Sequence, residues 1–122
     1  MISIFLWLVC STGTCHAATI EMIPAAVAIA SCESGDGLNW GMMDWGARSP
    51  TDDGGAFQFN DATYQWLAGH AHAETDSPPA QYRQFIRLWD DGAGWRHWAA
   101  SKPCWGQWLY IDDAGRAVFD AP

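Results

Sequence analysis

The sequence predicts a small, mainly α-helical domain with a minor β component, an α+β fold. Its 122 residues suffice for one domain with a modest core. Hydrophobic residues make up 49% of the chain, which excludes disorder over most of its length. Apolar residues at helical spacing with capping residues predict three helices, and two short apolar runs around a turn predict a C-terminal β-hairpin.

Residues 1–18 are predicted to be a secretory signal peptide. The apolar run from Ile2 to Val9 is too short to span a bilayer, and polar and small residues follow it. Cleavage is expected after Ala17 or Ala18, which implies a secreted, periplasmic or cell-wall location. A signal peptide usually carries a Lys or Arg before its apolar run, and this sequence has none there. The alternative is a buried N-terminal strand or helix.

The first helix is expected to begin at Pro24 and to end at Gly35, a residue suited to a left-handed cap. Glu33 shares a helical stripe with Ile29 and Ala30, so we expect its carboxyl group to lie among apolar side chains. Because burial disfavours the charged form, its pKa should be raised, as a general acid near neutral pH requires. The alternative is a solvated glutamate at a helix end.

Residues 36–55 follow as a long loop rich in glycine and aspartate, of a length that is usually functional or mobile. A second helix is expected over residues 62–68, capped by Asn60 or Asp61 and closed by Gly69. A third helix should open at Ser77. Its core-facing stripe comprises Tyr82, Phe85, Ile86 and Trp89.

Residues 95–100 predict another short helical piece, in which Trp95 and Trp98 belong either to the core or to a groove wall. Residues 108–111 and 116–119 predict the two strands of the C-terminal hairpin. Because an isolated hairpin is only marginally stable, it should pack on the helical body.

The formal net charge of −8 argues against nucleic-acid binding and against docking on an anionic membrane surface. Nine tryptophans can fill a core, but they also offer flat surfaces for stacking on sugars. His70 and His72 are only a weak indication of a metal site, and no metal or cofactor is expected. If the signal peptide is cleaved, one cysteine pair remains, which favours a Cys32–Cys104 disulfide over a zinc site.

Four stretches in this order resemble the transglycosylase-like domain of resuscitation-promoting factors, which belongs to the lysozyme-like superfamily. They are Cys32-Glu33-Ser34-Gly35, Asn39-Trp40, Gly55-x-x-Gln58-Phe59-x-x-x-Thr63-Tyr64, and Gly94-Trp95-x-x-Trp98 with Cys104 behind it. The Glu-Ser-Gly and Gly-x-x-Gln pieces also resemble soluble lytic transglycosylases. The resemblance covers about residues 27–104 and implies a lysozyme-like catalytic domain over residues 19–107, followed by a tail or hairpin over residues 108–122.

The resemblance implies cleavage of peptidoglycan between N-acetylmuramic acid and N-acetylglucosamine by a monomer that needs no cofactor. Glu33 matches the sole catalytic glutamate of the family, Gln58 and Thr63 match polar residues that contact the glycan, and Cys32 and Cys104 match its disulfide. The remaining candidates for substrate contact are the aromatic residues of the matching stretches, Trp40, Phe59, Tyr64 and Trp95.

The sequence also departs from the family. The loop between Glu33 and Gln58 is longer than usual, Tyr64 replaces a tryptophan, Ala56 replaces a frequent second glycine, and the tail after Cys104 has no counterpart. These departures bear on the shape of the groove and on the register of the substrate.

Two mechanisms remain open for a glycosidase with this sequence. With Glu33 as the only carboxylate, a group of the substrate itself takes the role of nucleophile and a 1,6-anhydro product results. With Asp52 or Asp53 as a second carboxylate, the enzyme is a hydrolase. Two further alternatives are a glycan-binding module without activity and a structural part of a virion or secretion machine.

Overall fold

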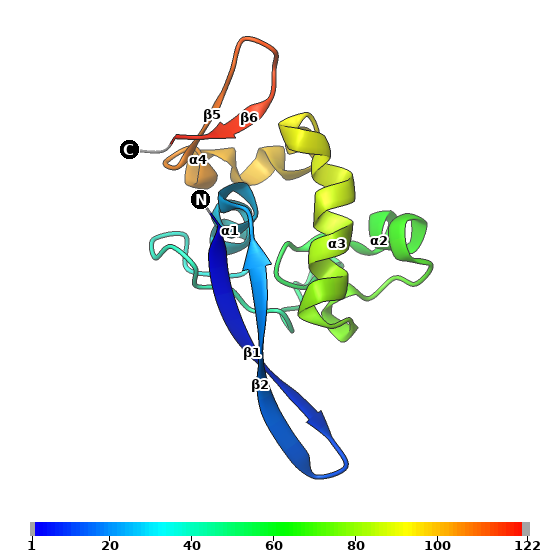
Figure 1. Ribbon diagram of the computed structural model, residues 1–122. Coiled ribbons are helices and arrows are strands. Elements are labelled where there is room, and N and C mark those ends of the chain that lie inside the picture. Colours follow the sequence, from blue (N-terminus) through cyan, green and yellow to red (C-terminus); the bar gives the residue numbers. More distant parts are fainter. Residues whose placement is uncertain (1, 121–122) are drawn as a thin grey trace.

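The computed structural model describes residues 2–120 and confirms a mixed α+β fold (Figure 1). The α-helices of this part are α1 (Pro24–Glu33), α2 (Asp61–Ala68), α3 (Pro78–Trp89) and α4 (Lys102–Trp105). Short 3₁₀ helices are η1 (Ala73–Thr75), η2 (Asp90–Gly92) and η3 (Trp95–Ser101). Three antiparallel hairpins pair β1 (Ser3–Ser11) with β2 (Thr14–Met22), β3 (Asp53–Gly54) with β4 (Phe59–Asn60), and β5 (Leu109–Ile111) with β6 (Ala117–Phe119).

Helix α1 lies at the centre of the core. All its residues from Ala25 to Ser31 are buried, as expected for a helix that is apolar on every side. Large side chains of the same cluster come from other elements, among them Phe57, Phe85 and Trp105. The rings of Phe57 and Phe85 stack with their centroids 4.5 Å apart. The position of Glu33, the last residue of α1, is therefore fixed by the core.

The predicted start and end of the second helix and the predicted start of the third helix are confirmed, and the third helix ends at Trp89. The side chain of Asn60 accepts a hydrogen bond from the Ala62 N–H, and Gly69 ends α2 at a φ of +85°. Ser77 accepts a hydrogen bond from the Ala80 N–H at the start of α3. In the predicted stripe of α3, Phe85 and Trp89 are buried, as are Gln81 and Leu88. Ile86, by contrast, is exposed, because it lies at the outer edge of this face.

The predicted cap of the first helix is wrong. Ser34 is the C-cap, with a φ of −122°, and Gly35 does not adopt a left-handed conformation. A Cβ atom at Gly35 would instead overlap the carbonyl oxygen of Met42. Glycine is required there because the loop packs closely against the helix end, which is a tertiary contact that a local capping pattern cannot reveal.

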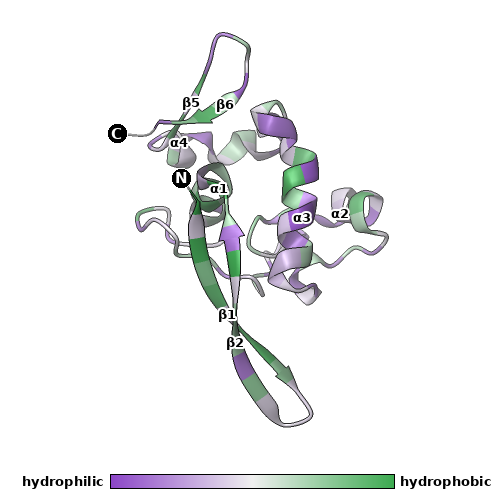
Figure 2. Cartoon of the chain, viewed as in Figure 1, coloured by the Kyte–Doolittle hydropathy of each residue, from purple (hydrophilic) through white to green (hydrophobic). Residues whose placement is uncertain are grey.

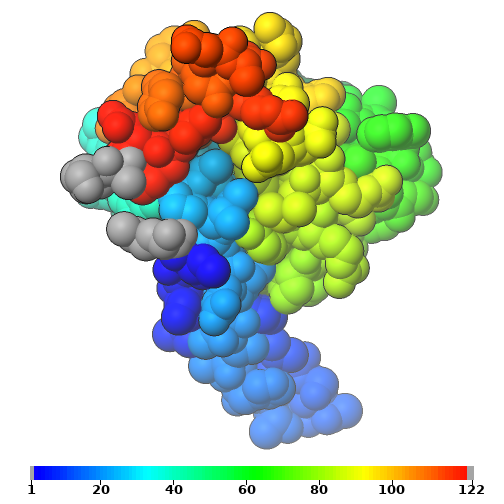
Figure 3. Space-filling model, turned by 45° about the horizontal axis from the view of Figure 1, so that its top comes forward, coloured from blue at the N-terminus to red at the C-terminus, as the bar shows by residue number. Residues whose placement is uncertain are grey.

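Strands β1 and β2 form a long hairpin that projects from the body of the molecule (Figures 1 and 3). A disulfide joins Cys10 to Cys15 beside the turn. Apolar residues run along β1 (Figure 2), and its Ile4, Leu6 and Leu8 side chains are exposed. Cleavage of residues 1–18 as a signal peptide stays a prediction.

The C-terminal hairpin β5–β6 is confirmed, and it packs on the end of α3 and on η3. Arg116 donates hydrogen bonds from Nη1 to the carbonyl oxygens of Asp90 and Asp91, and Trp95 donates one from Nε1 to the Gly115 carbonyl. A disulfide joins Cys32 to Cys104, as the sequence predicts. None of the helices within residues 2–120 has the length and apolar character needed to cross a membrane.

Candidate active site

The candidate site is built around Glu33, a partly buried carboxyl group at the end of α1. The Ser101 hydroxyl group donates a hydrogen bond to its Oε1 atom at 2.6 Å. Burial raises the pKa of Glu33, the hydrogen bond from Ser101 lowers it, and the charge of Asp53 raises it. The net effect is a raised pKa, so the carboxyl group retains its proton to a higher pH than an ordinary glutamate.

Two serines of α1 and its C-cap hold the following loop in place around Glu33. Ser31 donates a hydrogen bond to the Val27 carbonyl and accepts one from the Gly41 N–H at 2.9 Å. Ser34 accepts one from the Asp44 N–H, also at 2.9 Å. The loop is thus attached to the helix on both sides of Glu33. The two serine side chains accept hydrogen bonds from backbone N–H groups of the loop.

The two aspartates proposed as a second carboxylate have different surroundings. Asp53 is partly buried in β3 and accepts hydrogen bonds from Thr51 Oγ1 at 2.9 Å and Ser49 Oγ at 3.3 Å. Asp52 is exposed and forms an ion pair with Arg48 at 3.3 Å. Of these two aspartates, only Asp53 contributes to the raised pKa of Glu33. The structure therefore distinguishes between them: Asp53 lies toward the site, and Asp52 faces solvent.

The turn that carries Gln58 depends on close contacts with other parts of the protein. A Cβ atom at Gly54 would clash with the Glu74 carboxylate, and one at Gly55 would overlap Gln81 Oε1. Gln58 itself has a φ of +50°, a conformation rarely seen outside glycine, and its Nε2 donates a hydrogen bond to the Gly55 carbonyl at 3.0 Å. The glycines of this stretch thus allow close approach of protein side chains.

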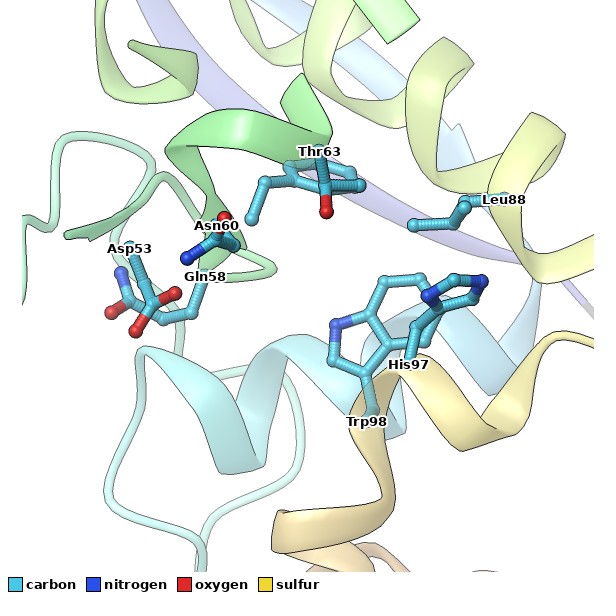
Figure 4. A pocket seen from close by; sticks show the side chains of 8 residues that line it. Asp53, Gln58, Asn60, Thr63, Leu88, His97 and Trp98 are labelled. Carbon is cyan, nitrogen blue, oxygen red and sulfur yellow. The ribbon is translucent and has the colours of Figure 1, made fainter. Parts of the chain in front are cut away.

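A pocket of about 90 Å³ lies between the β3–β4 hairpin, α2, α3 and η3. Figure 4 shows Asp53 and Gln58 at one end, Leu88, His97 and Trp98 at the other, and the Thr63 hydroxyl group between them. Phe59 and Asn60 complete the lining. Glu33 is not part of this lining. Two observations relate it to the pocket: its hydrogen bond to Ser101 of η3, the helix that also carries Trp98, and the effect of the pocket residue Asp53 on its pKa.

The structure brings the predicted residues Gln58, Phe59 and Thr63 together in this pocket. Trp98 forms part of the wall and also belongs to the core, because it is buried and its Nε1 donates to the Phe57 carbonyl at 2.9 Å. The sequence left both roles open for Trp98.

Three other predicted contact residues lie outside the pocket lining. Tyr64 is fully buried, and its hydroxyl group donates a hydrogen bond to Asp76 at 2.6 Å. Trp95 packs near the C-terminal hairpin, to which it is hydrogen-bonded. Trp40 packs against Trp108, with ring centroids 5.3 Å apart. In all three cases the aromatic ring contacts other parts of the protein.

Sequence reasoning missed Ser101, His97, Leu88 and Gln81. The side chain of Gln81 is fully buried and bonds to the Ala56 N–H and to the Trp45 and Asp76 carbonyls. Ser101 lies 68 residues from Glu33 in the chain, so no local pattern connects the two. Leu88 offered one local signal, since it lies three residues after Phe85 on the same helix face.

A cluster of Asp61, His72 and Glu74 has side-chain atoms within 4.8 Å of one another, the arrangement of a metal site. Arg48 occupies this position. Its Nη1 lies 2.6 Å from Asp61 Oδ1, 3.2 Å from His72 Nδ1 and 3.3 Å from Glu74 Oε1. The guanidinium group already supplies the positive charge that the carboxylates require, so the cluster is explained as an ion-pair network.

Comparison of the chain with protein-family models, with curated proteins and with solved structures gives no match. The two disulfides are typical of proteins from an oxidising compartment, such as the periplasm or the extracellular space.

Proposed function

We propose that this chain is a peptidoglycan-cleaving glycosidase of lysozyme-like fold and lytic transglycosylase type. The observation that carries the proposal is the environment of Glu33, a carboxyl group whose pKa is raised by burial and by the charge of Asp53, a residue that lines a polar pocket. A carboxyl group that keeps its proton to a higher pH than an ordinary glutamate is better suited to donate it to a leaving oxygen, which cleavage of a glycosidic bond requires. The order of the Glu33, Gln58 and Thr63 motifs supports peptidoglycan as the substrate.

In the proposed reaction, protonated Glu33 donates its proton to the glycosidic oxygen as the bond from C1 to that oxygen breaks. The hydroxyl group of Ser101 stabilises the carboxylate that forms. The 6-hydroxyl group of the same muramyl residue then attacks C1, and Glu33 takes up its proton. The product is a 1,6-anhydro sugar, and no water is consumed.

A second candidate is a lysozyme-type hydrolase in which Asp53 is the second carboxylate. The charge of Asp53 acts on Glu33, and Asp53 lines the pocket, which favours it over Asp52. In a hydrolase, Asp53 would act as a nucleophile or would activate a water molecule. The product would then carry an ordinary reducing end.

The test is digestion of purified peptidoglycan with analysis of product masses. Glu33→Gln should lower the rate by about 100-fold or more, since general acid catalysis contributes this much. The control Glu21→Gln changes an exposed glutamate on β2 and should leave the rate unchanged. Undiminished cleavage by Glu33→Gln would refute the assignment.

The products distinguish the two mechanisms. Anhydro ends, together with activity that survives in Asp53→Asn, support the transglycosylase. Reducing ends, together with loss of activity in Asp53→Asn, support the hydrolase. Tight binding of glycan strands with no product from the unmodified protein would indicate a binding module, and failure to bind them would indicate a structural role.

A further inference from the structure

A second cavity, of about 270 Å³, neighbours the pocket of the candidate site. The two cavities share Leu88 and His97. The first, at about 90 Å³, is well below the roughly 300 Å³ at which pockets for small-molecule ligands begin. It therefore has room for only part of a glycan strand, and the remainder must lie in adjoining parts of the surface.

Trp66, on α2, lines the second cavity and is 74% exposed. A single exposed apolar residue needs no explanation by itself. Here, however, the indole ring borders a cavity that shares Leu88 and His97 with the pocket of the candidate site. A tryptophan ring with one free face is well suited to stack on the apolar face of a sugar ring.

Arg87 lies in the same cavity and is held in a fixed position. Its Nη1 donates hydrogen bonds to the Leu67 carbonyl at 2.8 Å and to Gln84 Oε1 at 3.0 Å, which links α3 to α2. Within residues 2–120, its Nε and Nη2 atoms make no hydrogen bond to the protein. Of the six lysines and arginines in this chain of net charge −8, Arg87 is the one that lines this cavity, where its charge is set against that of Asp90. A guanidinium group binds carboxylates in a fixed geometry.

We propose that this second cavity is a distal glycan subsite, in which Trp66 stacks on an N-acetylated sugar ring and Arg87 binds a carboxylate carried by the strand. The site accepts β-1,4-linked N-acetyl amino sugars through Trp66, and it favours those with an acidic lactyl or peptide substituent through Arg87. The inference rests on the proposed function for the identity of the strand, whereas binding at the subsite requires no cleavage.

The test measures binding by calorimetry to the Glu33→Gln protein, which keeps the strands intact. Chitin oligomers of two, four and six sugars provide the uncharged probe, and muramyl-peptide fragments of the same lengths provide the acidic probe. Trp66→Ala should weaken binding of the longest oligomers about tenfold and leave the shortest unchanged. Arg87→Gln should weaken binding of the acidic fragments but not of chitin oligomers. The matched control Tyr110→Ala removes an exposed aromatic ring outside both cavities.

The results separate this inference from the proposed function. If the Glu33→Gln protein binds oligomers of every length equally well with and without Trp66→Ala, the subsite is overturned, even if the unmodified protein cleaves peptidoglycan. Conversely, a length-dependent loss in a protein that never cleaves would support the subsite and refute the glycosidase. Thermal unfolding of each variant verifies that any loss of binding does not reflect loss of folding.

Discussion

The protonation state of Glu33 depends on groups that act in opposite directions. Burial and the charge of Asp53 raise its pKa, whereas the hydrogen bond from Ser101 lowers it because the hydroxyl group stabilises the carboxylate. In a reaction that uses the carboxylic acid, activity falls as pH rises through this pKa. Ser101 therefore has an effect that can be observed separately from folding.

Ser101→Ala should shift the alkaline limb of the pH profile of kcat/KM to higher pH. Removal of the hydrogen bond destabilises the ionised form, so Glu33 keeps its proton to a higher pH. Ser101→Thr retains a hydroxyl group and should restore the limb toward its original position. The measurement is the rate of peptidoglycan cleavage between pH 4 and 9, and a limb that stays in place or moves to lower pH would contradict this role.

The raised pKa of Glu33 also has a consequence for stability. Because the folded-state pKa lies above the unfolded-state value, the free energy of unfolding is highest below the unfolded value and decreases as pH rises through the folded one. Glu33→Gln removes this dependence. We expect its Tm to exceed that of the unmodified protein at pH 8 and the difference to shrink at pH 4. A lower Tm at pH 8 would show that the carboxylate stabilises the fold.

At the level of elements, the Gln81 side chain joins α3 to the turn that carries Gln58. Its three hydrogen bonds reach Ala56, Trp45 and Asp76, all of them backbone groups. Gln81→Leu leaves these groups without their partner and should lower the free energy of unfolding by about 3 kcal/mol. Chemical denaturation measures this loss. The control Gln65→Leu, at an exposed position of α2, should change it by less than about 0.5 kcal/mol.

The two disulfides should differ in their contribution to stability. Cys32–Cys104 spans 72 residues and attaches the helix of Glu33 to α4, whereas Cys10–Cys15 spans only 5. In the chain-entropy model, the long loop contributes about 4 kcal/mol and the short one about 2 kcal/mol. Replacement of each pair by alanines, followed by denaturation, tests this order. A larger loss from the Cys10–Cys15 pair would contradict it.

At the level of the whole molecule, the features predicted from the sequence are those determined by neighbouring residues. The helix starts at Asn60 and Ser77 follow from side chains that cap the next turn, and the C-terminal hairpin follows from two short apolar runs around a turn. Gln58, Phe59 and Thr63 could be grouped because one short stretch contains them all.

What could not be predicted depends on contacts between distant segments. Ser101 reaches Glu33 across 68 residues, and Gln81 reaches Ala56 across 25. The chemistry of an aromatic ring is the same in a core and in a groove, so Tyr64 could be assigned to a groove by sequence although its side chain is buried. Gly35 suits a left-handed cap, but the packing of Met42 determines its actual role.

The N-terminal hairpin allows a prediction about the whole molecule. Of its residues, the two that belong to the buried core are Ile20 and Met22, which both follow the expected cleavage site. Phe5 and Trp7 are only partly buried against the body. A fragment of residues 19–122 should therefore fold cooperatively, with the Cys10–Cys15 disulfide removed along with the outer hairpin.

A fragment of residues 24–122 should have a much lower free energy of unfolding. It also loses Ile20, Met22 and the hydrogen bond from the Ile23 N–H to the Tyr82 hydroxyl group. Burial of an isoleucine and a methionine contributes about 4 kcal/mol, a large part of the stability of a domain of this size. Circular dichroism during thermal unfolding compares both fragments with the full chain. Failure of the longer fragment to fold would make the outer hairpin an integral part of the domain and would contradict its removal as a signal peptide.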